Sequence, residues 1–481
     1  MEQMATFEQE VKSYKSKQLA AADLIEIVSK LWINHSIELV LFRNQLVDRR
    51  GSLILRLHQE TSALTSGEIL IEETLEIARR IDEMILPPSR IDIGTLALQA
   101  RNKQADEPLL TFARKRLASV IHHPIFEPKD VVLYGFGRIG RLLAREIISQ
   151  AVGGAQLRLR AIVTRDAINE GNLEKRANLL LQDSIHGDFQ GIVEVDASNN
   201  SLIINGNRVY IISAKNPEDT DYSIYGIQDA LIIDNTGVFR DKKELSRHLD
   251  AKGVRQVLLT APGKDIPNIV HGVNDPEVVP LETTICSAAS CTTNAISPIL
   301  AILENTLGIA KGHIETVHAY TNDQNLVDNM HKKHRRGRAA ALNMVITETG
   351  AGTAVAKIIP SLYGKLSSNA IRVPVPNGSL AILQLELKTP CTKERLLAIL
   401  KSAALQGPLV EQIKFETNAE LVSSDILGTS AAAVIDAPAT IVSNSGENII
   451  LYIWYDNEYG YTHQVMRLAK HMAGVKRYTY Y

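Results

Sequence analysis

The chain has 481 residues, which is more than one hydrophobic core usually organises, so two or three domains are expected. Hydrophobic residues make up 45% and charged residues 22%, a balance that excludes a disordered or fibrous protein. The formal net charge of −2 gives no whole-chain reason to expect nucleic acid or an acidic membrane surface as the main partner.

Residues 1–127 carry the spacing of amphipathic helices. Apolar side chains recur at three- and four-residue steps, as one helix face requires: Leu24, Ile25, Val28, Leu31 and Trp32. Strand signals are few, so an all-α N-terminal extension is expected. The first residues mix both charges without the apolar core of a signal peptide, and no run of about 18 apolar residues occurs. These features predict a cytoplasmic protein without a membrane span.

A proline-containing linker, residues 122–130, precedes a chain of different pattern. Short apolar runs alternate with helix-like stretches, which favours a doubly wound parallel sheet; the runs are 131–136, 157–164, 230–237 and 256–263. From residue 312 onward, longer strand-like segments indicate a second, mostly antiparallel sheet.

Glycines mark the turn after the first of these strands, in the pattern G-x-G-x-x-G. Such glycines permit a tight turn and let a pyrophosphate approach the free N–H groups of a helix start. The alternative is a structural glycine turn in another α/β fold. The expected dinucleotide contacts in this loop are Gly135, Phe136, Gly137, Arg138, Ile139 and Gly140.

The predicted fold class is therefore α/β, with a Rossmann-type dinucleotide-binding domain over residues 128–290 and an α+β catalytic domain over 291–459. The helical extension, residues 1–127, precedes them. A C-terminal helix of about residues 460–481 is expected to pack back on the dinucleotide-binding domain.

The second strand ends in Thr164 and Arg165, where an NAD-preferring site usually carries an acidic residue for the ribose hydroxyl. Asp166 is close but two residues too late. The missing carboxylate removes repulsion against a 2′-phosphate, and Arg165 can pair with that group. NADP is thus a candidate cofactor. A solvent-facing Arg165 in an NAD enzyme is the alternative.

Three cysteines occur, Cys286, Cys291 and Cys391, and their spacing suits neither a disulfide framework nor a tetrahedral zinc site. No metal is expected. Cys291 follows an apolar run and precedes a helix-like segment, where a helix start favours the thiolate. His318, at the end of another predicted strand, completes a cysteine–histidine pair suited to attack on an aldehyde and subsequent hydride removal.

Eight short motifs occur in the order and approximate spacing of phosphorylating glyceraldehyde-3-phosphate dehydrogenases: GFGRIGR, DSIHG, TGVF, SCTTN, HAYTND, TGAGTAVAKIIP, IRVPVP and WYDNEYGY. The chain resembles this family over about residues 129–481. The resemblance implies that Cys291 forms a hemithioacetal with the aldehyde and that His318 acts as base and transition-state hydrogen-bond donor. It also implies hydride transfer to nicotinamide and cleavage of the thioester by phosphate.

The resemblance implies two anion positions. One, for the substrate C3 phosphate, matches Thr321, Asp323 and Arg372. The other, for the attacking phosphate, matches Ser290, Thr292, Thr349, Gly350 and Arg336. The neighbouring Arg338 leaves the last assignment ambiguous. Hydroxyls, backbone N–H groups and guanidinium forks are suitable phosphate donors.

Further family matches concern the cofactor. Asn457 matches the asparagine that orients the nicotinamide carboxamide, Thr260 is a further expected contact, and Tyr461 lies beside the ring or packs in the core. Residues 320–345 match the long S-loop that packs near the cofactor of a neighbouring subunit, which implies a homo-oligomer, a tetramer by resemblance. Asn329 and Met330 replace the Leu-Pro typical of NAD-specific members, a second feature compatible with NADP.

Two departures remain. Ala295 replaces a cysteine that family members often have four residues after the nucleophile, so one intramolecular disulfide is excluded. Residues 1–127 have no counterpart in the ordinary family core, and they form either a cap or oligomerisation region or a module for regulation or partner recruitment.

The resemblance implies reversible oxidative phosphorylation of glyceraldehyde 3-phosphate to 1,3-bisphosphoglycerate, with NAD or NADP as cofactor. The expected partners are the phosphorylated aldehyde, inorganic phosphate and further copies of the chain, with neither membrane nor nucleic acid. Two alternatives stay open: an erythrose-4-phosphate dehydrogenase, and a catalytically retired scaffold of the same fold.

Overall fold

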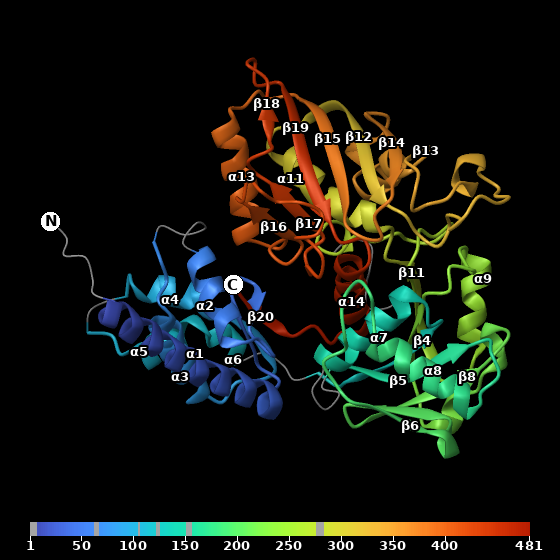
Figure 1. Ribbon diagram of the computed structural model, residues 1–481, viewed down its shortest axis with the longest axis horizontal. Coiled ribbons are helices and arrows are strands. Elements are labelled where there is room, and N and C mark those ends of the chain that lie inside the picture. The colour runs from blue at the N-terminus through green and yellow to red at the C-terminus, as the bar shows by residue number, and fades with distance from the viewer. Residues whose placement is uncertain (1–6, 62–66, 104–105, 122–125, 151–155, 276–282) are drawn as a thin grey trace. The chain divides into compact units, whose positions relative to one another are not determined.

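The computed structural model describes residues 7–61, 67–103, 106–121, 126–150, 156–275 and 283–481. The chain divides into two compact units (Figure 1). The first comprises the residues up to Glu127 together with Lys476–Tyr481, and the second comprises Pro128–Val475. Part of the linker expected from the sequence, residues 122–125, lies outside the described residues. None of the described helices has the length and apolar character needed to cross a bilayer.

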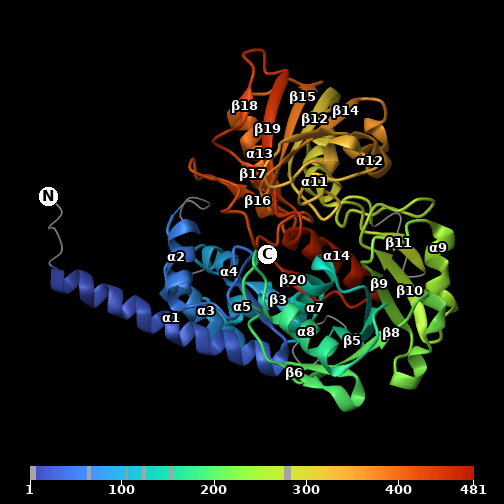
Figure 2. The same cartoon turned by 45° about the vertical axis from the view of Figure 1, so that its right-hand side comes forward.

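The first unit is built from helices and a small sheet. The helices are α1 (Phe7–His35), α2 (Gly51–Thr61), α3 (Ile71–Asp82), α4 (Ile93–Ala100), α5 (Leu109–Arg116) and α6 (Ala118–Ile121). The predicted apolar face of α1 is confirmed, because Leu24, Val28, Leu31 and Trp32 are buried. The first half of α1 is mostly exposed and extends beyond the other helices of this unit (Figure 2).

The prediction of a helical region is confirmed, but its description as all-α is corrected by a four-stranded sheet. Its strands are β1 (Glu38–Leu41), β2 (Asn44–Gln45), β3 (Ser89–Asp92) and β20 (Tyr478–Tyr480), in the order β2-β1-β3-β20. The strands are too short for a clear periodic signal, and one of them comes from the other end of the chain. Arg477 anchors that C-terminal segment by donating to Glu38 Oε2 at 2.6 Å.

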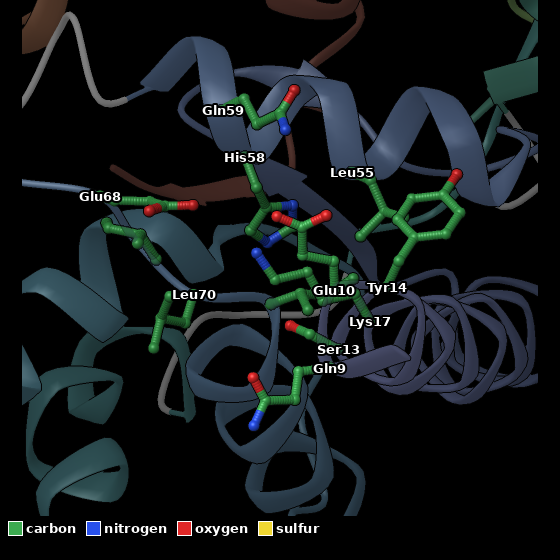
Figure 3. A pocket seen from close by; sticks show the side chains of 12 residues that line it. Gln9, Glu10, Ser13, Tyr14, Lys17, Leu55, His58, Gln59, Glu68 and Leu70 are labelled. Carbon is green, nitrogen blue, oxygen red and sulfur yellow. The ribbon is translucent and has the colours of Figure 1, made fainter. Parts of the chain in front are cut away.

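A pocket of about 360 Å³ opens between α1, α2 and residues 68–71 (Figure 3). His58 lies in its wall, and burial lowers the pKa of its ring. Its Nδ1 is 2.7 Å from the Ile54 carbonyl oxygen and its Nε2 is 2.8 Å from Thr74 Oγ1. Nδ1 is therefore held within α2 and Nε2 joins α2 to α3, which indicates a structural role for this histidine.

The second unit contains an eight-stranded sheet with the order β11-β10-β9-β4-β5-β8-β7-β6. The run from β11 to β8 is parallel, as the sequence predicts. The strands are β4 (Lys129–Tyr134), β5 (Leu157–Thr164), β6 (Val193–Asp196), β7 (Ser201–Ile204), β8 (Asn207–Ser213), β9 (Ala230–Asp234), β10 (Val254–Leu259) and β11 (Ile285–Ser287). Because parallel strands end at one edge, the segments that follow β4, β5, β9, β10 and β11 meet there.

Helices α7 (Arg138–Gln150), α8 (Glu170–Leu181) and α9 (Lys242–Ser246) accompany this sheet. The C-terminal helix α14 (Tyr459–Ala473) contacts α7, where Lys470 Nζ donates to Gln150 Oε1 at 2.7 Å. The helix expected over about residues 460–481 ends earlier, because Gly474 takes a left-handed conformation with φ +69°. The remaining residues extend into β20.

The second unit also contains a second sheet of eight strands. Seven of them follow the order β13-β14-β12-β15-β19-β17-β16, and the eighth, β18, pairs with β19 beside this row. Five of its seven described strand pairs are antiparallel, in line with the sequence prediction. The strands are β12 (Ile309–Ala319), β13 (Val345–Thr347), β14 (Leu366–Val373), β15 (Ser379–Leu387), β16 (Ile413–Glu416), β17 (Ala433–Asp436), β18 (Ile441–Val442) and β19 (Asn448–Tyr455).

Helices α11 (Cys291–Thr306), α12 (Ala351–Ile358) and α13 (Lys393–Leu405) share one hydrophobic core with this second sheet. Ile299 of α11, Val355 of α12 and Leu400 of α13 are fully buried in it. The packing fixes the start of α11, and with it Cys291, against the ends of β12 and β19.

Candidate active site

Cys291 is the first residue of α11 and is half-buried. Ser290 caps this helix, because its hydroxyl oxygen accepts a hydrogen bond from the Thr293 N–H at 3.1 Å. The Asn294 side chain donates to two carbonyl oxygens of the preceding turn, at 2.7 and 2.9 Å. Ala289 in that turn has φ +54°, a conformation that few non-glycine residues adopt. The turn therefore holds the cysteine in one position.

His318 lies next to the last residue of β12, with its Nε2 3.6 Å from the sulfur of Cys291. The parallel pairing of β12 with β14 sets His318 directly opposite Arg372. As a result, the His318 Nδ1 is 2.8 Å from Arg372 Nη1 and 2.7 Å from the Ala319 carbonyl oxygen. The carbonyl favours a proton on Nδ1, and the guanidinium favours the other tautomer. His318 can thus present either a lone pair or an N–H to the sulfur.

The surroundings of this pair shift both pKa values. Burial, followed by the charge of Arg372, lowers the pKa of His318 to about 3. Burial raises the pKa of the Cys291 thiol, while Arg372 and hydrogen bonds at the start of α11 oppose that rise. The thiolate predicted from the helix start is therefore favoured by the helix and by Arg372 but disfavoured by burial.

Tyr455, at the end of β19, is a site residue that the sequence reading did not single out. Its hydroxyl is 3.1 Å from Thr292 Oγ1, and its ring stands edge-on to the His318 ring with centroids 5.9 Å apart. The Thr292 hydroxyl, expected to bind phosphate, is thus engaged inside the protein. Its backbone N–H in the first turn of α11 is the group suited to an anion. The motif WYDNEYGY contains Tyr455, but nothing in the motif distinguishes it from the other tyrosines.

The other candidate anion-binding residues gather around two arginines. Arg336 forms an ion pair with Asp323 and donates to Thr347 Oγ1 at 3.1 Å. Arg338, the alternative to Arg336, instead pairs with Asp328 at 2.8 Å. Arg336 also lowers the pKa of His318, so both Arg336 and Arg372 act electrostatically on this histidine.

Three further candidates lie on neighbouring segments. Thr349 precedes α12, where its hydroxyl oxygen accepts from the Ala351 N–H at 3.3 Å, and Gly350 is the N-cap residue. A Cβ added at Gly350 would meet no atom within 4 Å. Thr321 follows β12 and is half-buried. Within the described chain, the buried Arg372 Nε has no hydrogen-bond partner, so it remains available to an anion.

The three glycines of the loop after β4 differ in the space that surrounds them. Gly135 has φ +109°, and a Cβ there would lie 2.7 Å from Asn235 Oδ1. A Cβ at Gly140 would lie 2.5 Å from the same oxygen and 2.8 Å from the Gly135 carbonyl oxygen. A Cβ at Gly137 would meet nothing within 4 Å. Two glycines are therefore required by packing, and the third leaves open space, as the approach of a pyrophosphate requires. The sequence reading missed Asn235.

The side chain of Arg138, in the cofactor loop, is engaged within the protein. Its guanidinium donates to Asp183 at 2.6 Å and to Glu458 at 2.9 Å, so the side chain links the start of α7 to the segments that follow α8 and β19. Only its backbone, at the start of α7, is left for a phosphate. Phe136 and Ile139, which flank it, are half-buried.

The ends of β5 and β10 carry the remaining cofactor candidates. The Thr164 hydroxyl is buried and finds no hydrogen-bond partner among the described residues, while Arg165 beside it is exposed. Asp166 forms an ion pair with Arg176 of α8 at 2.8 Å. The Thr260 hydroxyl donates to the Asp234 carbonyl oxygen at 3.1 Å and is therefore engaged inside the protein.

Asn457 and Tyr461 flank the cysteine turn. The Asn457 Oδ1 accepts from Ser379 Oγ at 2.7 Å, which leaves its Nδ2 as the free end of the amide to donate. The Tyr461 hydroxyl donates to the Ala289 carbonyl oxygen at 2.8 Å, and burial raises its pKa. Of the two alternatives for Tyr461, this arrangement favours core packing beneath the cysteine turn.

Two family models match the chain: the NAD binding domain of glyceraldehyde 3-phosphate dehydrogenase over residues 129–242, and its C-terminal domain over residues 290–457. A glyceraldehyde-3-phosphate dehydrogenase-like protein of Pseudomonas aeruginosa is 44% identical over 458 residues, covering 94% of this chain and 98% of that relative. The chain belongs to the glyceraldehyde-3-phosphate dehydrogenase family. The predicted fold class and the prediction of a dinucleotide-dependent oxidoreductase are confirmed at the level of this family.

Other relatives in the family match a smaller share of the chain. The glyceraldehyde-3-phosphate dehydrogenase of Streptomyces coelicolor is 39% identical over 70% of this chain and 97% of its own length. That of Geobacillus stearothermophilus is 37% identical over 71% of this chain and 98% of its own length. The Pseudomonas match covers 94% and so includes most of residues 1–127. The N-terminal unit is therefore shared with that relative.

The segment matching the family's S-loop, residues 320–345, is held by its own backbone. The Asn329 N–H donates to the Gly337 carbonyl oxygen at 2.8 Å. Met330 is 94% exposed, and further apolar side chains on or beside this segment are exposed: Leu326, Val327, Leu342, Met344 and Ile346. Such a group of exposed apolar side chains is typical of a protein interface.

Proposed function

We propose that this protein is a phosphorylating glyceraldehyde-3-phosphate dehydrogenase that oxidises glyceraldehyde 3-phosphate to 1,3-bisphosphoglycerate. The observation that carries the proposal is the cysteine–histidine pair, 3.6 Å apart, with two guanidinium groups acting on it. A phosphorylated aldehyde and a free phosphate supply one anion for each guanidinium group.

The chain's own residues account for the bond changes at the aldehyde. Cys291 Sγ attacks the aldehyde carbon, and the thiol proton passes to His318 Nε2. The developing oxyanion is stabilised by the Cys291 backbone N–H at the start of α11 and by the protonated His318. A nicotinamide dinucleotide held by the glycine loop after β4 would supply the acceptor for the hydride that leaves the aldehyde carbon. A phosphate oxygen then attacks the thioester carbon, and the cysteine sulfur leaves.

We assign the substrate phosphate to Arg372, whose Nε has no internal partner among the described residues. We assign the attacking phosphate to Arg336 and to the backbone N–H groups at the starts of α11 and α12. Asp323 neutralises Arg336 through their ion pair. An incoming phosphate therefore competes with a carboxylate for this guanidinium, which keeps the attacking anion exchangeable.

We further propose NADP as the preferred dinucleotide. Thr164 and Arg165 end β5 where a carboxylate would repel a 2′-phosphate, and Asp166 is engaged with Arg176. The orphaned Thr164 hydroxyl and the exposed Arg165 are both donors suited to that phosphate. Asn329 and Met330 give the same preference by family resemblance.

Steady-state turnover tests both proposals, with NAD and NADP compared at saturating glyceraldehyde 3-phosphate and phosphate. Turnover should require phosphate, and Cys291→Ala should abolish it while dinucleotide binding persists. A strong preference for erythrose 4-phosphate without phosphate dependence rejects the substrate assignment. Absence of turnover with either aldehyde, in a folded protein that binds dinucleotide, favours the retired scaffold.

Arg372→Gln tests the substrate phosphate position. It should raise the KM for glyceraldehyde 3-phosphate at least about tenfold while leaving the KM for unphosphorylated glyceraldehyde unchanged, because only the first substrate carries the anion. The kcat should fall for both substrates, since Arg372 also contacts His318. Arg338→Gln, at a surface ion pair, is the matched control. Equal KM changes for both aldehydes contradict the assignment.

A homo-oligomer, with four copies by family resemblance, is proposed from the exposed apolar residues of the segment 320–345. Sedimentation equilibrium measures the mass directly. A double substitution, Met330→Ser and Leu342→Ser, should dissociate the assembly, and an unchanged mass would contradict this interface.

A further inference from the structure

Two histidines and one carboxylate come together away from the catalytic pair, in the second unit. His271 and Asp275 belong to the connection that follows β10, and His471 lies in the last turn of α14. Each offers one ligand atom, and these three atoms lie within 4.8 Å of one another. The rings of His271 and His471 have centroids 5.7 Å apart. Sequence spacing gives no signal for this cluster, because His471 lies far along the chain.

The local backbone holds the carboxylate in place. Gly272, at φ +80°, turns the chain so that the side chains of His271 and Asp275 face each other and form an ion pair. The Gly272 N–H donates to Asp275 Oδ1 at 2.8 Å, which leaves Oδ2 directed to the histidine. Gln412 Nε2 donates to the His271 carbonyl oxygen at 3.3 Å. Supporting hydrogen bonds of this kind orient metal ligands in proteins.

Burial makes a cation favourable at this place. His271 is 6% exposed and Asp275 is 3% exposed, so the carboxylate has lost most of its contact with water. An ionised buried carboxylate requires compensation by a positive charge. A bound cation supplies that charge. It is also coordinated by the imidazole nitrogens, which bind metal only when the ring is neutral.

We propose that His271, Asp275 and His471 bind a divalent transition-metal ion, with Zn²⁺ as the best match. Two imidazoles and one carboxylate form a ligand set typical of zinc, with a fourth position open to water. Bonds of about 2.0–2.2 Å to a common ion bring tetrahedral ligand atoms to roughly 3.3–3.6 Å from one another. Binding therefore requires the half-buried His471, at a helix end, to move closer and the hydrogen-bonded pair of His271 and Asp275 to separate slightly.

Such an ion joins two segments that are separate in sequence. The connection after β10 leads through β11 to the cysteine turn, and α14 carries Tyr461, whose hydroxyl supports that turn. The ion fixes the C-terminal end of α14 to the connection after β10, away from the cysteine–histidine pair. The competing explanation is a simple ion pair between His271 and Asp275, in which His471 has no role.

The test is metal titration of the full-length protein freed of metal with a chelator. The Cys291→Ser variant is used throughout, because the catalytic thiol and His318 can also bind zinc. Isothermal titration calorimetry with Zn²⁺ should give one site per chain. Visible absorption with Co²⁺ should give the spectrum of a site with nitrogen and oxygen ligands, without the sulfur charge-transfer band that binding at a cysteine produces.

His471→Gln decides between the two explanations, because it leaves the His271–Asp275 pair intact. It should weaken Zn²⁺ binding more than about tenfold, a loss at least as large as that from removing a supporting residue. Asp275→Asn should do the same, and His35→Gln, at an exposed histidine, should leave the affinity unchanged. Circular dichroism in chelator verifies that each variant is folded.

The proposal is overturned if the Cys291→Ser protein binds no Zn²⁺, or if His471→Gln binds it as tightly as the protein with His471. It is also overturned if Zn²⁺ raises the thermal midpoint of the His471→Gln and unsubstituted proteins equally. If Asp275→Asn does not fold, His471→Gln alone carries the decision, since this helix-end residue is half-buried.

Discussion

Gly137 and Gly140 offer a matched pair of substitutions in the cofactor loop. Both lie outside the left-handed region of backbone conformation, so alanine is sterically allowed by the backbone at either position. Their surroundings differ sharply. A Cβ at Gly137 meets no atom within 4 Å, whereas a Cβ at Gly140 lies 2.5 Å from Asn235 Oδ1 and 2.8 Å from the Gly135 carbonyl oxygen.

These distances set the expected effects on stability. Ordinary contacts between non-bonded carbon atoms lie near about 3.5–4.0 Å, so Gly140→Ala must displace both a side chain and a backbone carbonyl. Such overpacking costs about 1–3 kcal/mol, of which at most about 1 kcal/mol is offset by the better helix propensity of alanine. Gly137→Ala should leave the free energy of unfolding unchanged or raise it by up to about 1 kcal/mol, because alanine restricts the unfolded chain.

For dinucleotide binding we expect a clear effect of Gly137→Ala, the substitution that should leave stability unchanged. The methyl group of Gly137→Ala projects into the open space where we expect the pyrophosphate, so affinity should fall at least about tenfold, or about 1.4 kcal/mol. Urea unfolding measures the stability of each variant, and fluorescence titration with NAD and NADP measures binding. Undiminished affinity in Gly137→Ala would refute the position of the cofactor. A Gly140→Ala protein as stable as the parent would refute the packing argument.

Three further predictions concern the catalytic pair and its neighbours. His318→Asn should reduce kcat by about 10²–10⁴, the usual contribution of acid–base help, and a full rate with an unchanged pH profile would contradict this role. Burial lowers the pKa of His318 from 6.5 to about 3, so the unfolded chain alone binds its proton in this interval. The free energy of unfolding should therefore fall as the pH drops from 6.5 towards 3, and it should fall less steeply in His318→Gln. Thermal unfolding across that pH range measures both slopes, and equal slopes would contradict the lowered pKa of His318. Tyr455→Phe should lower the free energy of unfolding by about 1–3 kcal/mol because Thr292 loses a buried partner, whereas Tyr452→Phe should change it little.

The candidate catalytic residues could be identified from the sequence because their motifs are local. Cys291 lies in SCTTN and His318 in HAYTND, and each motif places its residue at the start of a helix or the end of a strand. The contacts of these residues could not be predicted. Tyr455 reaches Thr292, and Arg372 reaches His318, through pairing between strands that are distant in sequence.

Arg138 illustrates the same limit in the cofactor loop. The motif GFGRIGR assigns it to the dinucleotide, but its side chain joins Asp183 and Glu458, which come from other parts of the chain. Asn235, which crowds two of the three glycines, follows a strand whose position beside β4 is decided only by the order of the sheet.

The sequence by itself determined the family, the parallel sheet that begins after residue 128, the candidate nucleophile and the glycine loop. Each of these depends on patterns within a few neighbouring residues, where backbone geometry and helix starts act. Tertiary structure alone decided which glycines are required by packing, which hydroxyls are engaged, that a C-terminal strand completes the first sheet, and that His471 lies beside Asp275. These features arise where segments distant in sequence meet. A polar group buried there without a hydrogen bond costs free energy, so the fold provides it with a partner from another segment.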